Sequence, residues 1–416
     1  MSSSASLQTA LRQLCQPVRR RDYPQSLATM RALRGATSAA RRNALEIVVT
    51  GSSGKSSLGH RLAALLQANG LRSGCYLSPH LHSFRERFLL NGNRIDLPAF
   101  CEGAALVAQA ADKLPVTVSS FERGTALALW WFQQCEVPLV VLETGIGGRF
   151  DAVNVVDNCL ALFTRIEEEH TEWLGGDLAS VAWHKAGILQ PGGHAVSAPQ
   201  TPEVAAILLA EARRVGAELQ FTDLDLAAAA LVNLADRGLL QLASDLPKMP
   251  LSALPGRLEP VTPTCGPPLL IDGGHTAEAG RYLRTYLERE SGFTGGIQLV
   301  AGFLADKDAC AWLKVFDDPR FHITLTRAPG HRAADPQRIS AACRLARAGL
   351  DLVPDVGDAL RLARQSKAQA VVVSGSLRLA AHVRELLGLL SAAELAEARL
   401  TASVFSGAGY LSRLPD

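Results

Sequence analysis

The sequence predicts an α/β protein with two domains, each built on a mostly parallel sheet covered by helices. Three observations support this prediction. The chain has 416 residues, which is long for a single hydrophobic core. Short apolar segments alternate with longer amphipathic ones, as in sheets whose parallel strands are joined by helices. A proline-rich stretch, 247–257, interrupts this alternation once, so we place the domain boundary near residue 255 and expect domains 1–255 and 256–416.

The segments expected to form strands are short runs of aliphatic residues. The first of them leads into a glycine-rich turn and then into a segment with Leu58, Leu62 and Leu65 on one helical face. That segment closes with Asn69-Gly70, a common helix C-terminus. The expected strands are 45–49, 139–142, 160–164, 269–272, 298–302, 323–326 and 371–375.

Composition excludes several classes of protein. Hydrophobic residues make up 48% and charged residues 20% of the chain, as in folded globular proteins. The net charge of +2, without a basic cluster interleaved with aromatic residues, argues against nucleic-acid binding. The eight cysteines include no Cys-x-x-Cys pair, so neither a zinc site nor a disulfide framework is indicated. No apolar stretch reaches the ~20 residues of a membrane span. We therefore expect a cytoplasmic protein.

The turn after the first strand has the pattern of a phosphate-binding loop. A glycine-rich turn that opens a helix gathers backbone N–H groups and the positive helix end around one point, which suits an anion. Lys55 would reach the terminal phosphates, and Ser56 or Ser57 could offer a hydroxyl group to Mg²⁺. A strict Walker A motif needs glycine at position 49, where this chain has Val49, so a plain strand-to-helix turn remains the alternative. The residues of the turn are Gly51, Ser52, Ser53, Gly54, Lys55, Ser56 and Ser57.

A carboxylate closes the second expected strand. Glu143 follows four apolar residues, where an ionised group is costly unless it is paired. Beside a phosphate-binding loop, the natural partner is Mg²⁺, which prefers oxygen ligands. The alternative partner is a nearby arginine such as Arg149.

Together, these motifs resemble those of the Mur ligase superfamily and, within it, the folylpolyglutamate synthase/dihydrofolate synthase family. The resemblance covers nearly the whole chain, with the motifs in the family order. It implies an N-terminal P-loop NTPase-like Mur ligase central domain and a smaller, Rossmann-like C-terminal α/β domain. Besides the P-loop, the matching segments are 78–81, 84–87, 91–92, 121–122, 142–154, 169–175, 185–188, 254–257, 272–275, 306–308, 332–333 and 374–376.

The resemblance implies an ATP-dependent amide ligase. Such an enzyme would activate the carboxylate of a folate or dihydropteroate as an acyl phosphate and join it to an amino acid, expected to be L-glutamate. ATP would bind between the two domains of a monomer, and the other partners would be small molecules only. Two alternatives remain open. One is a ligase of the same chemistry recruited to a non-folate carboxylate, such as a natural-product or cofactor precursor, and the other is a non-catalytic nucleotide-binding homologue.

The family motifs also imply roles for individual residues. Lys55, Lys185 and His275 would act in catalysis, Arg257 would contact phosphate as the P-loop does, and Asp272 would contact the ribose. The residues implied as ligands of Mg²⁺, with two ions expected, are Ser57, Glu143, His170 and a carbamylated Lys185. The residues implied for the acid substrate are Ser78, Pro79, His80, Phe121, Asp151 and Asn154.

The chain departs from the family pattern at several positions. Ser52-Ser53 replaces the usual Thr-Asn, and Ser56 replaces a glycine. Glu169 stands where the family has aspartate before His170. Thr276 replaces the asparagine after the histidine, and the asparagine expected to contact adenine is replaced near Leu226. These changes affect the surroundings of the base and of the acid substrate more than those of the phosphates.

Overall fold

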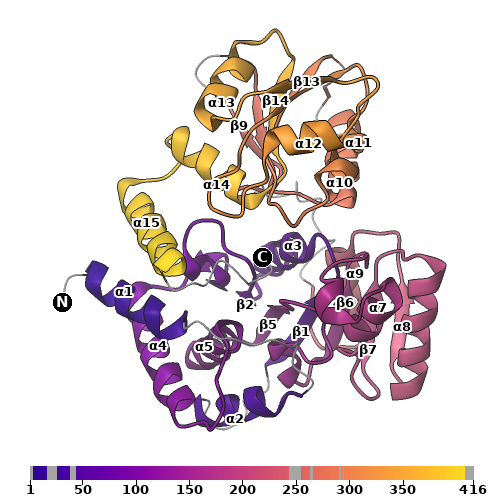
Figure 1. Cartoon of the computed structure of the whole chain (residues 1–416). Helices are drawn as coiled ribbons and strands as arrows, with labels where there is room; N and C mark the ends of the chain where they lie inside the picture. Colours follow the sequence, from indigo (N-terminus) through magenta and orange to yellow (C-terminus); the bar gives the residue numbers. More distant parts are fainter. Residues whose placement is uncertain are drawn as a thin grey trace. The chain divides into compact units, whose positions relative to one another are not determined.

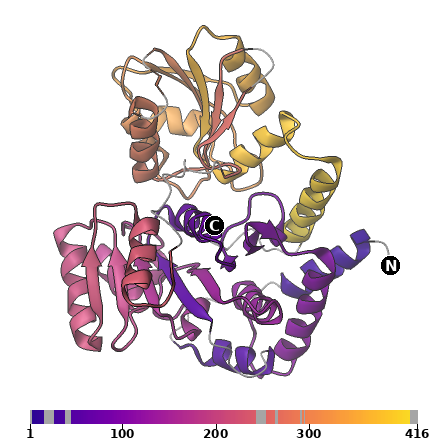
Figure 2. The same ribbon diagram turned by 180° about the vertical axis from the view of Figure 1, so that it is seen from behind.

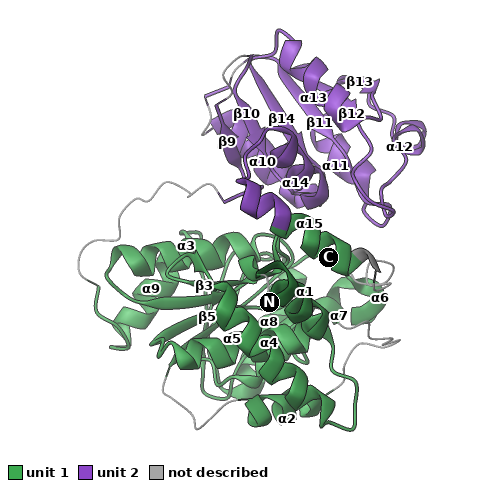
Figure 3. Ribbon diagram, turned by 90° about the vertical axis from the view of Figure 1, so that its left-hand side faces the viewer, with its two compact units in different colours: residues 1–251, 397–416 green, residues 252–396 purple. Residues whose placement is uncertain are grey.

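A computed structural model of the chain shows two compact units, Met1–Leu251 with Glu397–Asp416, and Ser252–Ala396 (Figure 3). The predicted boundary at residue 255 lies close to the point where the first unit ends, at Leu251, but the structure assigns the end of the chain to the first unit. Much of the proline-rich stretch, 247–253, lies outside the described residues. The structure describes residues 3–15, 26–37, 44–242, 254–262, 266–289, 292–293 and 295–407.

The first unit contains an eight-stranded sheet with the order β4-β3-β2-β5-β1-β6-β7-β8 (Figure 1). Its strands pair in parallel except around β3, which is antiparallel to β2 and to β4. Because β5, β1 and β6 are adjacent and parallel, the loops after them meet at one edge of the sheet. The strands are β1 Leu45–Thr50, β2 Ser73–Tyr76, β3 Phe88–Leu90, β4 Asn93–Arg94, β5 Leu139–Glu143, β6 Leu160–Phe163, β7 His194–Ser197 and β8 Glu218–Phe221.

Helices cover both faces of this sheet, which explains why its central strands are apolar throughout. Ile47 and Val49 of β1 belong to a core with α3 and α9, whereas Val48 belongs to the core on the other face, with α4, α5 and α7. The helices are α1 Ser3–Leu14, α2 Ala28–Thr37, α3 Lys55–Ala68, α4 Leu97–Asp112, α5 Ser120–Gln134, α6 Thr171–Leu174, α7 Leu178–Ala186, α8 Pro202–Val215, α9 Leu226–Asp236 and the 3₁₀ helices η1 Phe84–Arg87 and η2 Ala152–Val155.

The second unit contains a six-stranded sheet with the order β13-β12-β11-β14-β10-β9, in which only β9 is antiparallel to its neighbour. Figure 2 shows the elements of this unit, in orange to yellow, from behind. Trp312, Phe316 and Phe321 lie in the core between this sheet and α10, α11 and α12. The elements are β9 Glu259–Val261, β10 Leu269–Ile271, α10 Ala277–Arg289, β11 Ile297–Ala301, α11 Ala309–Val315, β12 Phe321–Leu325, α12 Pro336–Ala342, β13 Gly349–Leu352, α13 Val356–Gln365, β14 Ala370–Ser374 and α14 Leu377–Leu386.

The last helix, α15 (Ala392–Gly407), begins in the second unit and ends in the first. The predicted α/β class with two mostly parallel sheets is confirmed. Among the residues that the structure describes, no helix is both long enough and apolar enough to cross a membrane.

Candidate active site

The P-loop connects β1 to α3 through a turn that depends on glycine. Gly51 has a φ of +141°, and a Cβ atom added there would lie 1.8 Å from Oγ1 of Thr164. Gly54, the N-cap residue of α3, has a φ of +83° and no side chain that could cap the helix. The turn therefore places the N-terminus of a 14-residue helix at the edge of the sheet without a side-chain cap, as an anion-binding site requires.

The P-loop is held from both sides by the neighbouring loops. Ser52 N donates to Arg165 O at 2.9 Å, and Glu167 N donates to Ser52 Oγ at 2.9 Å. On the other side, Thr50 Oγ1 donates to Gly147 O at 2.8 Å. These bonds join the loops after β6 and β5 to the loop after β1, so its backbone N–H groups are held in place before a ligand binds.

Two lysines and one glutamate meet at Gly51. Lys185 Nζ, from the end of α7, donates to Gly51 O at 2.8 Å and lies 2.6 Å from Oε1 of Glu169. Lys55 Nζ also donates to Gly51 O at 2.8 Å, and it lies 4.0 Å from the same Glu169 oxygen. Two cations thus share one carboxylate beside the helix N-terminus, and Glu143 supplies a second carboxylate nearby. The two lysines and the helix N-terminus are the groups here that favour the binding of phosphate.

Burial shifts the pKa values of this cluster. The side chain of Lys185 is only 1% exposed, and desolvation lowers its pKa to about 8, with Lys55 adding to the shift and Glu169 opposing it. Desolvation alone would raise the pKa of Glu169, but Lys185, Lys55 and His170 outweigh it and lower that pKa to about 2. The glutamate is therefore ionised, and the buried lysine amine deprotonates more easily than an ordinary lysine does.

Glu143, at the end of β5, is 2% exposed and lies between the P-loop helix and the loop after β2. Its carboxylate accepts hydrogen bonds from Ser56 Oγ at 2.9 Å and from Ser78 N at 2.8 Å. Arg149, the alternative partner suggested by the sequence, pairs instead with Glu211 at 2.7 Å. Carboxylate and hydroxyl oxygens beside a P-loop fit Mg²⁺, which prefers hard oxygen ligands.

His170 lies directly after Glu169 and before α6. Its φ of +51° is uncommon for a residue other than glycine and directs the chain from the Glu169 cluster into the helix. Across the described ranges, no three residues of the His, Cys, Asp and Glu types form a group that could hold a metal ion by themselves. The predicted set of Ser57, Glu143, His170 and carbamylated Lys185 does not need such a group, and it stays a prediction.

The residues predicted for the acid substrate come from three loops at the same edge of the sheet. Ser78, Pro79 and His80 follow β2, and Ser78 contacts Glu143 as described above. Phe121, in the first turn of α5, has its ring centroid 5.8 Å from that of Tyr76 in β2. The same ring lies against Gly145, so close that a side chain at that glycine would collide with it. The structure thus brings the loop after β2, the start of α5 and the loop after β5 together.

Asp151 and Asn154 organise this last loop. Asp151 Oδ2 accepts from Gly145 N at 2.9 Å and from Ile146 N at 3.1 Å, and burial raises the pKa of its carboxyl group to about 7. Asn154 Nδ2 donates to Gly187 O at 3.0 Å, at the end of α7. Asp151 therefore shapes the loop after β5, and Asn154 joins this loop to the backbone next to Lys185.

The predicted nucleotide residues of the second unit lie around the turn after β10. Asp272 is buried and accepts hydrogen bonds from Gly274 N at 2.8 Å and Leu258 N at 3.2 Å. Burial raises the pKa of this carboxyl group, and Arg257 opposes the shift. His275 follows in the same turn, before Thr276. Arg257, Asp272 and His275 are thus gathered at one end of β10.

Two departures from the family pattern have structural roles. Thr276 Oγ1 accepts a hydrogen bond from Ala279 N at 3.1 Å, so the threonine caps the start of α10. Leu226 is the first residue of α9 and packs against the core that α9 shares with α3. Helix α9 is fixed there by an ion pair of 2.6 Å between Arg61 and the N-cap residue Asp225.

Sequence reasoning missed two contacts of the site. Glu169 binds both lysines, although the sequence singled it out only as a replacement for aspartate. Ser56, which replaces a glycine, donates to Glu143. The residues alone left Ser56 and Ser57 open as ligands of Mg²⁺, and the resemblance selected Ser57. A signal was present for Ser56, which adjoins Lys55 in the P-loop, but not for Glu169, which follows two other glutamates.

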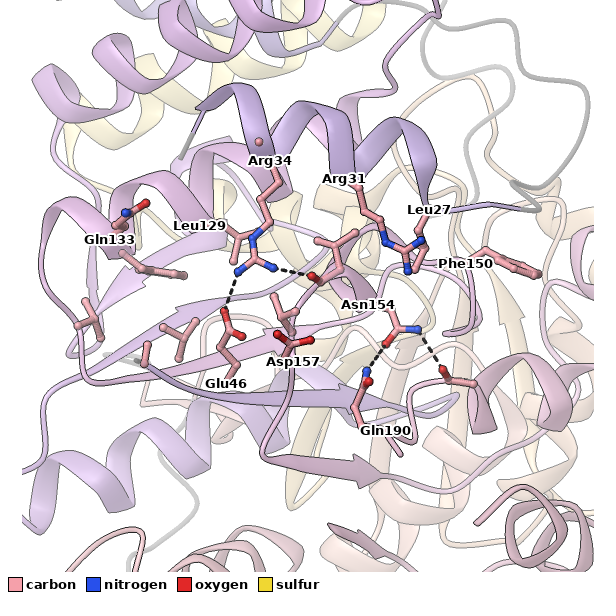
Figure 4. A pocket seen from close by; sticks show the side chains of 18 of the residues that line it. Leu27, Arg31, Arg34, Glu46, Leu129, Gln133, Phe150, Asn154, Asp157 and Gln190 are labelled. Atoms are coloured by element: carbon pink, nitrogen blue, oxygen red, sulfur yellow. Dashed lines mark hydrogen bonds and ion pairs between the residues drawn. The ribbon is translucent and has the colours of Figure 1, made fainter. Parts of the chain in front are cut away.

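A pocket of about 970 Å³ lies away from the P-loop, at the amino-terminal ends of β1 and β5 and next to α2 (Figure 4). Arg34 crosses it, with Nη2 3.5 Å from Oε1 of Glu46 and Nη1 donating to Val155 O. Arg31, Gln190 and Asn154 also line it, and Asn154 is the only residue of the predicted site that does so among the described lining residues. The pocket is therefore separate from the predicted phosphate site.

The first unit has a P-loop with a buried lysine and a buried glutamate beside it, and a second α/β unit follows. This arrangement defines an ATP-dependent ligase of the Mur ligase type. The chain is 30% identical over 400 residues to the folylpolyglutamate synthase of Lacticaseibacillus casei, covering 82% of this chain and 89% of that relative. It is 32% identical over 371 residues to the dihydrofolate synthase/folylpolyglutamate synthase of Escherichia coli K12, covering 82% and 86%. The chain belongs to the folylpolyglutamate synthase/dihydrofolate synthase family. No family model matches it.

Solved structures support the same assignment. Escherichia coli FolC in complex with DHPP and ADP superposes with a TM-score of 0.77 at 27% identity, over 93% of this chain and 98% of that one. The bifunctional folylpolyglutamate synthase/dihydrofolate synthase of Yersinia pestis, complexed with AMPPNP and a Mn ion, gives 0.77 at 28% identity, over 92% and 98%. A bifunctional synthase with Mn, AMPPNP and L-glutamate bound gives 0.74 at 29% identity, over 87% and 94%.

Proposed function

We propose that this protein joins L-glutamate to the carboxylate of a folate-type substrate, using ATP to form an acyl phosphate. The observation that supports this most directly is the meeting of Lys55, Lys185 and Glu169 at Gly51, next to the buried Glu143. The family assignment adds the substrates, because solved relatives hold an ATP analogue with L-glutamate, or DHPP with ADP.

The chemistry explains why such a site needs buried cations. A carboxylate is a poor acyl donor, because attack on it has no good leaving group until it has been phosphorylated. The γ-phosphate and the carboxylate are both anions, and their repulsion must be neutralised where they meet. Lys55 and the P-loop N–H groups would hold the phosphates, and Glu143 with Ser57 would hold Mg²⁺, which supplies further positive charge. The loops around Phe121 and Ser78 would then orient the acid.

We also propose that Lys185 is carbamylated in the active enzyme. Carbamate forms when a neutral amine attacks CO₂, and burial has already made the neutral form of Lys185 more accessible. The product would be an anion beside Glu169, so it needs a cation such as Mg²⁺ to be stable. Labelling with ¹³C-bicarbonate in the presence of Mg²⁺ should therefore mark the wild type and not Lys185→Arg. A wild type that takes up no label at this site contradicts the proposal.

The two alternatives lose part of their support. The replacement of the family asparagine by Thr276 favours the recruited ligase, but the hydroxyl of this residue also has a structural role, because it caps α10. A non-catalytic homologue would not need two buried or half-buried lysines around one P-loop carbonyl group. The expectation of a monomer stays a prediction.

The test is phosphate release from ATP with Mg²⁺ and L-glutamate, with and without dihydropteroate or tetrahydrofolate, followed by mass spectrometry of the products. We expect release that depends on the pterin and a product heavier by one glutamate. Lys55→Ala should abolish it, whereas Lys113→Ala, at an exposed position after α4, should leave it unchanged. ATP binding without release with either pterin would favour the recruited ligase, and release by Lys55→Ala would contradict the role of the P-loop.

A further inference from the structure

The end of the chain returns to the first unit and packs on the loop that follows β2. We infer that the segment Glu397–Phe405 of α15 forms one wall of the acid-substrate site, with Glu397 and Phe405 acting as positioning residues for the loop 78–87. This inference rests on the proposed function, because that loop carries three of the six residues predicted to contact the folate-type acid, Ser78, Pro79 and His80. It assigns a role in substrate binding to a helix that the sequence places in the other domain.

The first contact is a sheltered ion pair. Arg85 Nη1 lies 3.0 Å from Oε2 of Glu397, and the two side chains are only 15% and 12% exposed. The other oxygen of Glu397 accepts a hydrogen bond from Ser83 Oγ. Arg85 is fixed in turn, because its Nε and Nη2 donate to Ile95 O at 2.9 and 2.6 Å. One carboxylate of α15 therefore binds two side chains of the loop, and both are held by the first unit.

The second contact is aromatic. The ring of Phe405, 9% exposed, stacks on Phe84 with centroids 5.9 Å apart and lies 5.3 Å from the ring of His80. Phe84 is itself buried and contacts Phe100 in the core. On its other side, His80 accepts a hydrogen bond from Arg87 Nε at Nδ1, at 3.0 Å. His80 thus lies against the rings of both Phe84 and Phe405, so α15 touches a predicted substrate residue directly.

The loop connects this contact to the predicted metal ligand. At its start, Ser78 N donates to Glu143 and Ser78 O accepts from Ser56 Oγ at 3.1 Å. In its middle, Glu86 accepts from the N–H groups of Leu81 and Ser83, which makes the loop a compact body. A displacement at α15 would therefore move His80 relative to Glu143. We conclude that removing the contacts of α15 should weaken binding of the acid more than binding of ATP.

The experiment compares Phe405→Ala and Glu397→Gln with Arg399→Gln, which changes an exposed residue of the same helix. KM is measured separately for the folate-type acid and for ATP, and kcat is measured with both saturating. For the first two variants we expect KM for the acid to rise about ten-fold, with KM for ATP nearly unchanged. Phe405→Tyr, which keeps the ring, should restore most of the loss, and Arg399→Gln should resemble the wild type.

Hydrogen exchange of the loop gives a second measurement that needs no turnover. Amides of residues 81–88 should exchange faster in Phe405→Ala and Glu397→Gln than in the wild type and in Arg399→Gln. Unchanged exchange and an unchanged KM for the acid would overturn the inference, as would an equal rise in both KM values. If the wild type used no folate-type acid at all, the proposed function would fail, and the exchange rates would still show whether α15 holds the loop.

Discussion

At the scale of single residues, Asp151 combines opposing influences on one carboxyl group. Its two oxygens accept hydrogen bonds from the backbone N–H groups of Gly145, Ile146 and Val153, and these hydrogen bonds favour the ionised form. Burial favours the neutral form and raises the pKa to about 7. Between pH ~4 and pH ~7, the folded protein therefore holds a proton at Asp151 that the unfolded chain has released.

The sign of the resulting pH dependence follows from linkage. Because the folded state binds more protons in this window, the contribution of Asp151 to stability should fall as pH rises from ~4 to ~7 and stay constant above it, with a slope of at most ~1.4 kcal/mol per pH unit. The measurement is the melting temperature of the wild type minus that of Asp151→Asn at each pH. A difference that does not change over this range would mean that the three N–H groups keep the carboxylate ionised.

Much of the candidate site could be predicted from single residues. Lys55, Lys185 and Glu143 were predicted from their motifs. The structure brings the two lysines to Gly51, and Glu143 accepts a hydrogen bond from Ser56, the residue after Lys55. The role of Glu169 could not be predicted, because it follows two other glutamates and local sequence does not show which of the three turns toward a lysine of α7. Long-range pairing of this kind depends on the packing of α7 against the sheet.

At the scale of elements, the P-loop turn offers a test with its own matched control. Gly51→Ala places a Cβ atom 1.8 Å from Thr164 Oγ1 and 3.0 Å from its backbone carbon, so the turn must shift. Gly54→Ala meets no atom within 4 Å and is only strained by its φ of +83°, at a cost of ~1–2 kcal/mol. We expect Gly51→Ala to lower the melting temperature clearly more and to abolish ATP binding, both measured on the purified variants. Equal effects of the two changes would contradict the close packing of Gly51 against Thr164.

The central strands that the sequence predicted have side chains buried on both faces, although the short buried strands β2 and β7 were not predicted. The segments 45–49, 139–142 and 160–164 became β1, β5 and β6 in the centre of the first sheet. In contrast, β8 and β13 were not predicted, and both lie at sheet edges with several exposed residues. An edge strand with a solvated face lacks the continuous apolar run, so its pairing is decided by the sheet that it joins.

At the scale of the whole molecule, the prolines near residue 255 indicated where the chain passes from one unit to the next. They could not indicate that the chain returns. Local sequence does not show which surface α15 covers, because its ion pair joins residues 85 and 397, which are more than 300 positions apart. The structure therefore adds what local patterns lack, namely which surface the last helix covers.

The two units also allow a test of where the nucleotide binds. Each unit has its own sheet and core, so we expect two unfolding transitions in calorimetry of the ligand-free protein. The sequence predicts that ATP contacts Lys55 in the first unit and Arg257 and Asp272 in the second. If so, AMPPNP with Mg²⁺ should raise the midpoint temperatures of both transitions. The total stabilisation should be ~2.7 kcal/mol at a hundred times its Kd, and EDTA should remove most of it. Lys55→Ala should lose the shift. A rise confined to the first transition would show that the P-loop binds the nucleotide without Arg257 and Asp272.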